Sequence, residues 1–232
     1  SHLVDALLSS GAPVRAITRA GARSGAVRDP RVECHAMDLL AEDSVRRSPV
    51  WEGATHVFHV GGVTKAPTAA RFRSGNVRPT ANIFSALADR SAPPRCVLVS
   101  SQAAAGPAAA ADAPVREDDA PRPVEAYGES KLEAEREAMR QAGRVPIVIV
   151  RPGAVSGPRD RDFLRAFKQA ASRIALYASP REQAISIVHV SDLVDGLIRS
   201  AELPGAVGRT YFLANETPVT WSTIYRTVAE AT

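Results

Sequence analysis

The chain has 232 residues, of which 45% are apolar and 23% charged, a balance that excludes a largely disordered protein and allows one sizeable core. Its net charge of +4 is spread without a run of lysine and arginine, so nucleic-acid binding is not expected. Cys34 and Cys96 lie far apart, which argues against disulfides and zinc, and no apolar run approaches the roughly 20 residues of a membrane span. We expect a protein of the reducing cytoplasm that does not contact a membrane.

Short apolar strands alternate with helices along the first part of the chain. In chain order we predict a helix ending at Gly11, strands at 13–18 and 32–37, a strand within 55–62, a helix at 68–90, a strand at 95–101, a loop at 102–122, a helix at 124–142 and a strand at 145–152. Strands that are apolar throughout indicate a parallel sheet with both faces buried. The predicted fold class is therefore α/β, with a doubly wound parallel sheet.

The pattern loosens beyond Gly153. A loop at 156–162, a helix at 162–172, a strand at 184–190, a helix from Ser191, a strand at 210–214 and a closing helix are predicted. Such a mixed segment fits the carboxyl edge of the sheet, where ligands bind in these folds. We therefore divide the chain into a Rossmann-like dinucleotide-binding domain, 1–152, and a smaller substrate-binding segment, 153–232, partly interleaved with it.

The helix that begins near residue 124 carries a tyrosine four residues before a lysine, in VEAYGESKLEAERE. At this spacing Tyr127 and Lys131 share one helical face, and a nearby ammonium favours the phenolate. The phenol pKa should then fall toward neutrality, as a general acid or base requires. The alternative is an ordinary half-buried tyrosine beside a surface lysine. Ser100 and Ser101, at the end of the preceding strand, could bind the same substrate oxygen as Tyr127.

Eight segments together resemble the extended branch of the short-chain dehydrogenase/reductase superfamily, the NAD-dependent epimerase/dehydratase family, which includes nucleotide-sugar epimerases, hydroxysteroid dehydrogenases and dihydroflavonol reductases. In the family's order they are HLVDALLSSGAPVRAITR, MDLL, VFHVGGVTKA, NVRPTANI, VLVSSQAAAGP, YGESK, VIVRPGAVSGPRD and IVHVSDLVDGL. The resemblance implies a nicotinamide cofactor and hydride transfer to or from a carbon that bears oxygen. It makes Tyr127 the acid/base and Lys131 a ligand of the nicotinamide ribose. Ser101 would polarise the carbonyl; sugar epimerases usually use the next position, here Gln102.

The same resemblance implies further cofactor contacts. Asp38 would accept from the adenine amino group with Leu39 beneath the ring, although a turn aspartate is the plainer explanation. The cofactor would also meet Val60, Gly61, Gly62, Lys65 and Ser100 beside the two central strands, and Pro152 and Val155 at the nicotinamide carboxamide. A plain glycine turn, a solvated helix start and a strand-ending proline remain open for these positions.

Arg19 lies at the end of the strand that corresponds to the second strand of the family's fold, where the protein contacts the adenosine ribose. Arginine suits a 2′-phosphate, whereas NAD-binding proteins place an acidic residue there, so NADP is favoured over NAD. Arg23 could assist. His59, on an apolar strand, is expected to be a core histidine and not a metal ligand, and Asn76 resembles an asparagine that tethers neighbouring backbone.

No glycine-rich phosphate turn is found between a first strand and a first helix. We therefore expect the chain to be a fragment whose first strand lies upstream of Ser1, and whose closing helix is cut at Thr232. In the strand order 3-2-1-4-5-6 this leaves either a central slot between the strands at 13–18 and 55–60 or two halves that have closed up. Strands on either side of a slot should lie about 9–10 Å apart and should not pair. Such a fragment would bind dinucleotide poorly.

The sequence is compatible with three functions. The leading one is an NAD(P)-dependent oxidoreductase acting on a carbonyl or alcohol of a small molecule, and the alternative is a nucleotide-sugar epimerase or dehydratase. The third is a non-enzymatic dinucleotide-binding regulator, because fold alone does not determine function. Dimers through the helices at 70–90 and 124–142 would be usual for the family, but the sequence offers no evidence of its own for a homodimer.

Overall fold

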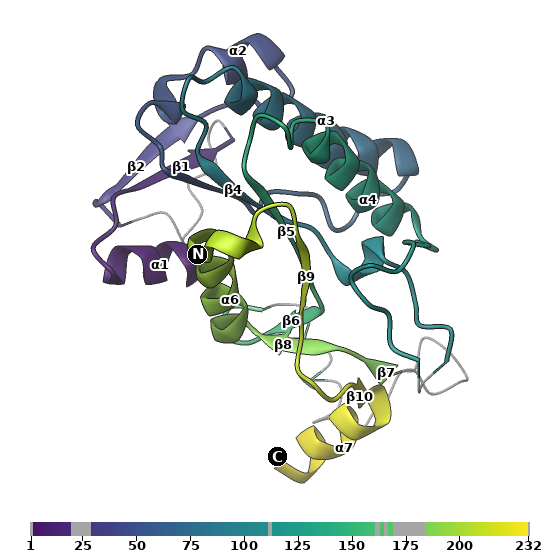
Figure 1. Cartoon of the computed structure of the whole chain (residues 1–232). Coiled ribbons are helices and arrows are strands. Elements are labelled where there is room, and N and C mark those ends of the chain that lie inside the picture. The colour runs from purple at the N-terminus through teal and green to yellow at the C-terminus, as the bar shows by residue number, and fades with distance from the viewer. Residues whose placement is uncertain are drawn as a thin grey trace.

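The computed structural model describes residues 2–19, 29–110, 113–160, 163–164, 167–168 and 184–231 (Figure 1). Its largest sheet has the strand order β3 (His56–His59), β4 (Arg95–Val99), β5 (Ile147–Pro152) and β9 (Thr210–Leu213), with every pair parallel. A second parallel sheet pairs β1 (Val14–Thr18) with β2 (Val32–Ala36). The predicted α/β class with a parallel sheet is confirmed.

Helices cover both faces of the larger sheet (Figure 1). On one side lie α2 (Glu42–Arg46), α3 (Ala69–Ala88) and α4 (Ala126–Met139), and on the other α1 (His2–Ser9) and α6 (Val190–Glu202). The closing helix α7 (Trp221–Ala231) follows at the C-terminal end. Short 3-10 turns complete the chain: η2 (Pro49–Trp51), η3 (Gln102–Ala104) and η4 (Pro204–Ala206).

Successive side chains of the central strands point to opposite faces of the sheet and form two hydrophobic cores. On β4, Cys96 and Leu98 join the core under α3 and α4, which contains Phe84 and Leu87, while Val97 points to the opposite core under α6. Successive strand side chains point to opposite faces, so an unbroken apolar strand buries both. This is the physical reason that the sequence reads as continuous apolar runs.

The two parallel sheets share no ladder: in the part of the chain described here, β1 pairs with β2 alone and β3 with β4 alone. The expectation that strands 13–18 and 55–60 do not pair is therefore confirmed. Asn82 of α3 donates to the Leu39 carbonyl at 2.8 Å, and Ile17 and Leu39 pack against the core under α3. Helix packing and this hydrogen bond hold the smaller sheet to the larger one.

Beyond β5 the chain forms small ladders. β6 (Ala154–Ser156) pairs in parallel with β8 (Ile187–His189), and β7 (Ala184–Ile185) pairs antiparallel with β10 (Val219–Thr220). The single strand predicted over 184–190 is wrong. It divides at Ser186, whose carbonyl accepts from Ala154 N at 2.8 Å. Most of the helix predicted at 162–172 lies outside the described residues.

Candidate active site

One side of α4 faces the sheet and carries three polar residues one turn apart. Lys131 and Glu135 are buried, at 6% and 4% exposed, and Tyr127 at the start of the helix is half-buried. Positions i, i+4 and i+8 stack along one helical face. The predicted alignment of Tyr127 and Lys131 is confirmed, and the structure adds Glu135 to it.

The phenol of Tyr127 meets the end of β4. That strand ends at Val99, and the chain continues through Ser100 and Ser101 into η3. The Ser101 hydroxyl lies close enough to the Tyr127 phenol to influence its pKa, and it accepts from Ala103 N at 3.2 Å. Phe72 of α3 packs against the tyrosine ring, with centroids 5.8 Å apart. Two elements distant in sequence thus hold a hydroxyl against a phenol.

Burial sets the acidity of Tyr127. Desolvation raises the pKa of the phenol above its ordinary value of 10.0, and the Ser101 hydroxyl beside it offsets this in part. The expectation that Lys131 lowers this pKa toward neutrality is wrong. The ammonium is directed at a main-chain carbonyl, and burial outweighs its influence. Tyr127 therefore stays protonated at neutral pH.

Lys131 reaches from α4 to the end of β4. Its Nζ donates to the Val99 carbonyl at 2.8 Å. Burial lowers its pKa to about 8, and the negative charge of Glu135 acts in the opposite direction. The alkyl part of the side chain is packed inside the protein. Because an ammonium has three N–H donors, the bond to Val99 leaves Lys131 able to donate further hydrogen bonds. Lys131 is thus a nearly buried cation at the carboxyl edge of the sheet.

His59, at the end of β3, is a core residue as predicted. It is 6% exposed, and its Nε2 lies 2.9 Å from the Thr80 hydroxyl. Burial, assisted by the positive charge of Lys131, lowers its pKa to about 3, so the imidazole is neutral. Among the described residues no cluster of three or more His, Cys, Asp or Glu side chains could hold a metal ion.

Asn76 tethers the segment after β3 to α4, which confirms its predicted structural role. Its Oδ1 accepts from Val63 N at 2.6 Å, and its Nδ2 donates to Val63 O at 3.0 Å and to the Ser130 hydroxyl at 2.9 Å. Ser130 in turn donates to the Tyr127 carbonyl. One buried amide therefore sets the position of residues 60–63 relative to the helix that carries the tyrosine and lysine.

This tether brings Gly62 against Lys131. A Cβ at position 62 would lie 3.0 Å from Asn76 Oδ1 and 3.7 Å from Lys131 Nζ. Gly61 and Gly62 expose their backbone, and the Val60 side chain is 53% exposed. Ser100 Oγ is buried and finds no hydrogen-bond partner in the described chain. The Gly62 backbone thus lies beside the ammonium, and Val60 and Ser100 stand in the segments that follow β3 and β4.

Other predicted residues lie outside this cluster. Asp38 follows β2, and its Oδ1 accepts from Leu40 N at 2.9 Å, as in an ordinary aspartate turn. Arg19, just after β1, and Lys65 are exposed. Arg23 lies outside the described residues.

The last two predicted positions follow the central strand. Pro152 is the last residue of β5 and lies in register with Leu213 of β9, so it ends the strand, as the simpler alternative had it. Val155 lies in β6 and packs against the core under α6. Both lie near the carboxyl edge of the sheet, but neither has a contact that reports a role.

Sequence reasoning missed a buried ion pair beside the cluster. Arg151 Nε and Nη2 donate to the two Glu135 carboxylate oxygens at 2.9 and 2.7 Å, and the guanidinium lies 5.8 Å from the Phe212 ring centroid. Two signals were available in the sequence. Glu135 stands four residues after Lys131, and Arg151 is a charge in an otherwise apolar strand, where a buried partner is required.

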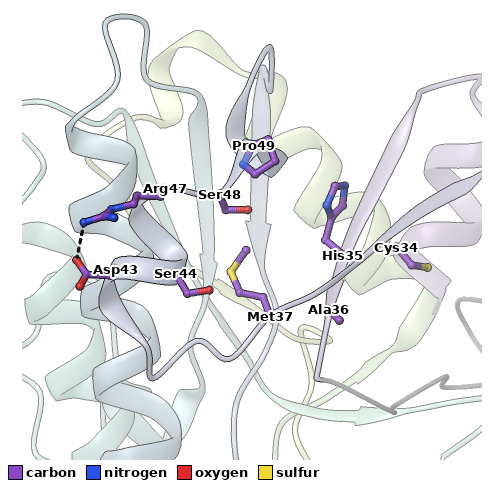
Figure 2. Close-up of a pocket in the computed structure, with 9 residues that line it drawn as sticks. All are labelled: Cys34, His35, Ala36, Met37, Asp43, Ser44, Arg47, Ser48 and Pro49. Atoms are coloured by element: carbon purple, nitrogen blue, oxygen red, sulfur yellow. Dashed lines mark ion pairs between the residues drawn. The ribbon is translucent and has the colours of Figure 1, made fainter.

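A cavity of about 650 Å³ lies elsewhere, between β2 and the segment 43–49 (Figure 2). Its lining includes Cys34, Met37, Asp43 and Arg47, and the last two form an exposed ion pair 4.0 Å apart. None of the Ser101, Tyr127 and Lys131 side chains lines it. The cavity is therefore separate from the chemistry described above.

A doubly wound parallel sheet whose carboxyl edge gathers a serine, a tyrosine and a lysine is the arrangement found in short-chain dehydrogenases/reductases. The family model "NAD dependent epimerase/dehydratase family" matches residues 1–214, and the chain belongs to that family. No helix among the described residues is long and apolar enough to cross a membrane.

Individual relatives have several activities. The chain is 30% identical over 203 residues to a ceramide reductase of Caulobacter vibrioides, with 88% of this chain and 57% of that protein covered. It is 26% identical over 177 residues to a UDP-glucose 4-epimerase of Vibrio cholerae, covering 75% and 54%. The solved structure of MoeE5 in complex with UDP-glucose and NAD has a TM-score of 0.83 at 26% identity, covering 100% and 77%. Against three curated relatives the chain spans only 54%, 57% and 64% of their length.

Proposed function

We propose that this chain provides the catalytic centre of an NAD(P)-dependent oxidoreductase that interconverts a carbonyl and an alcohol, with Ser101, Tyr127 and Lys131 as its catalytic residues. The observation that carries the proposal is the placement of the Ser101 hydroxyl beside the Tyr127 phenol, one helical turn from the buried ammonium that donates to Val99 O. Membership of the family supports the cofactor. Two hydroxyls beside one cation suit an oxygen on which negative charge develops.

The residues of the cluster fit a nicotinamide riboside. Ser100 Oγ is a buried hydroxyl without a partner among the described residues, a Cβ at Gly62 would lie only 3.0 Å from Asn76 Oδ1, and Val60 offers exposed apolar surface. Lys131 would hold the ribose hydroxyls, and the backbone at Gly61 and Gly62 would line the cofactor. When bound, the nicotinamide accepts or supplies the hydride.

Outer parts of the cofactor would meet residues further along the sheet edge. We assign the adenine to Asp38 and Leu39, the adenosine ribose to Arg19, and the carboxamide to Pro152 and Val155. An exposed arginine after β1 supports NADP. The structurally similar MoeE5, in contrast, was solved with NAD. Comparing the dissociation constants of NADH and NADPH distinguishes the two cofactors.

The protonation state of Tyr127 defines its part in the chemistry. Because burial raises its pKa, the phenol carries a proton at neutral pH and can donate it to a carbonyl oxygen as the hydride arrives. Ser101 would hydrogen-bond the same oxygen, and Lys131 would stabilise the charge that remains. The protonated phenol is the form that reduction of a carbonyl requires, and the reverse reaction would return the proton to Tyr127.

The second candidate is a nucleotide-sugar epimerase, favoured by the UDP-glucose 4-epimerase relative and by MoeE5 with its UDP-glucose. Against it, Gln102 occupies the position after Ser101, and its side-chain Nε2 donates to the Ser186 hydroxyl at 3.4 Å. Stoichiometry separates the two candidates. A reductase consumes one NAD(P)H for each carbonyl reduced, whereas an epimerase converts its sugar with no net change in the dinucleotide.

Replacing Tyr127 with phenylalanine tests the catalytic assignment. Loss of a positioned general acid should lower turnover about 10²–10⁴-fold while dinucleotide binding is retained. Tyr211→Phe, which removes a phenol from β9, is the matched control and should keep parental turnover. Wild-type turnover in Tyr127→Phe would exclude the mechanism. Dinucleotide binding without turnover of any carbonyl or sugar would favour a non-enzymatic regulator.

We further assign residues 1–152 to the dinucleotide and residues 153–232 to a small-molecule substrate, in a cytoplasmic protein that acts without nucleic acid or membrane. The short ladders β6–β8 and β7–β10 at the carboxyl edge support a substrate role for the second segment. A homodimer through α3 and α4 is a further proposal, which light scattering of the purified protein would test.

A further inference from the structure

Helix α4 makes a second connection to the sheet beside Lys131. Glu135 lies one turn further along the same face, and both of its carboxylate oxygens are bound by Arg151 of β5. The side chains of Glu135 and Arg151 are only 5% and 6% exposed. Ordinary stabilisation does not require charge at such a place, because apolar residues of similar volume serve as well or better.

The pair immobilises the Glu135 carboxylate. A guanidinium bound through two parallel N–H···O bonds is a directional clamp, and the Phe212 ring restricts Arg151 from another side. The Nη1 of Arg151 has no hydrogen-bond partner among the described residues, so Glu135 is its principal counter-charge. A carboxylate held in this way is fixed on the helical face that also carries Lys131, one turn away.

The polar and charged groups packed around Lys131 come from α3, α4 and three strands of the larger sheet. On α4 the titratable neighbours are Tyr127, which is protonated, and Glu135. From β3 comes His59, which is neutral, and β4 offers the Val99 carbonyl. β5 contributes Arg151, which is bound to the Glu135 carboxylate, and α3 contributes the uncharged Asn76. Glu135 is therefore the anion in this set that favours the Lys131 ammonium.

We propose that Glu135, clamped by Arg151, is a positioning residue whose fixed charge on the same helical face keeps the buried Lys131 ammonium protonated under neutral conditions. Burial alone works against an ammonium at this site, and its pKa of about 8 leaves a narrow margin above neutrality. The consequence for dinucleotide binding rests on the proposed function, but the effect on Lys131 itself does not.

The experiment measures Lys131 directly. The chain contains three lysines, Lys65, Lys131 and Lys168, so protein labelled with ¹³C,¹⁵N-lysine gives a simple Nζ spectrum, and Lys131→Arg assigns the signal. In Glu135→Gln the amide still accepts from Arg151 but the charge is gone. We expect the Lys131 midpoint to fall from about 8 by about one pH unit, the usual effect of losing an adjacent opposite charge.

Two further variants complete the design. Glu135→Gln/Arg151→Met also lacks the carboxylate and leaves no unpaired guanidinium, so it keeps the test available if the single variant does not fold. Glu133→Gln is the matched control. It removes a carboxylate from the same helix that is likewise bound bidentately, by Arg73, but at the surface. In Glu133→Gln the midpoint of the Lys131 titration should match that of the parent protein.

Titration of NADH and NADPH by fluorescence at each pH provides the second measurement. The loss of affinity on the alkaline side should move with the Lys131 midpoint, to about pH 7 in the Glu135 variants. An unchanged Lys131 midpoint in both Glu135 variants overturns this inference. Absence of dinucleotide binding by the parent at every pH contradicts the proposed function instead, and the lysine midpoints still decide the role of Glu135.

Discussion

Two glutamates two residues apart on α4 form the same kind of ion pair in opposite surroundings. Glu135 binds Arg151 at 2.9 and 2.7 Å, and Glu133 binds Arg73 at 2.7 and 3.0 Å. The inner side chains are 5% and 6% exposed, whereas Glu133 and Arg73 are 33% and 65% exposed. The bond geometry is almost identical, so any difference in effect comes from the solvent.

Water determines what each pair contributes. At the surface, solvent screens both charges, so the outer pair links α3 to α4 with little net stabilisation. Inside, each partner has lost its hydration and depends on the other, so removal of one leaves an uncompensated charge. The same burial acts on Lys131 and Tyr127, whose pKa values move in opposite directions because their neutral forms are favoured. The two faces of α4 should therefore respond very differently to mutation.

The largest expected effect comes from Arg151→Met. It leaves the buried Glu135 carboxylate without its hydrogen-bonded partner, so the free energy of unfolding should fall by about 3–5 kcal/mol. Urea denaturation followed by circular dichroism measures this. Adding Glu135→Leu should recover most of the loss, since the isolated charge is then removed. A single variant as stable as the parent would show that water reaches the inner pair.

A second effect appears as a pH dependence. The folded pKa of Lys131 is about 8, below the value of 10.5 for an unperturbed lysine, so between these pH values the unfolded state binds more protons. The free energy of unfolding of the parent should therefore rise with pH across this window, relative to Lys131→Met, by about 3 kcal/mol in total. Denaturation curves of both proteins from pH 7 to pH 10.5 give the difference. Parallel curves would mean that the ammonium is solvated.

Steric crowding on the inner face gives the next effect. A Cβ at Gly128 would lie 2.3 Å from the Ala103 carbonyl oxygen in η3, so Gly128→Ala must displace the turn that follows Ser101. We expect a loss of about 1–3 kcal/mol, measured by thermal unfolding, together with reduced turnover. Gly143→Ala, just after the helix, meets no atom within 4 Å and should leave both quantities near the parental values.

The smallest effect is expected on the outer face. Arg73→Ala breaks the exposed pair and should lower the free energy of unfolding by about 1 kcal/mol or less, with less effect in about 0.5 M salt. The Lys131 midpoint should not change. A loss comparable to that of Arg151→Met would remove the distinction between the faces and would mean that Arg73 has a larger packing role between α3 and α4.

Local features of the site could be predicted because they depend on spacing along one element. Tyr127 and Lys131 share a face by helical periodicity, and His59 is buried because its strand is apolar. The two serines were found by their place at the end of a strand, and resemblance to a family selected Ser101 and added Asn76. The acidity of Tyr127 could not be predicted in this way, because desolvation by Phe72 and the direction of the Lys131 side chain depend on α3 and β4.

By itself, the sequence determined the α/β class, the parallel strands with two buried faces, and the helical face that Tyr127 and Lys131 share, since each follows from residue periodicity along one element. Only the tertiary structure decided that Arg151 clamps Glu135, that Lys131 bonds to Val99, and that the strand at 184–190 divides at Ser186. These contacts join residues on different elements, and a buried charge or carbonyl selects its partner by proximity in three dimensions, which chain order does not specify.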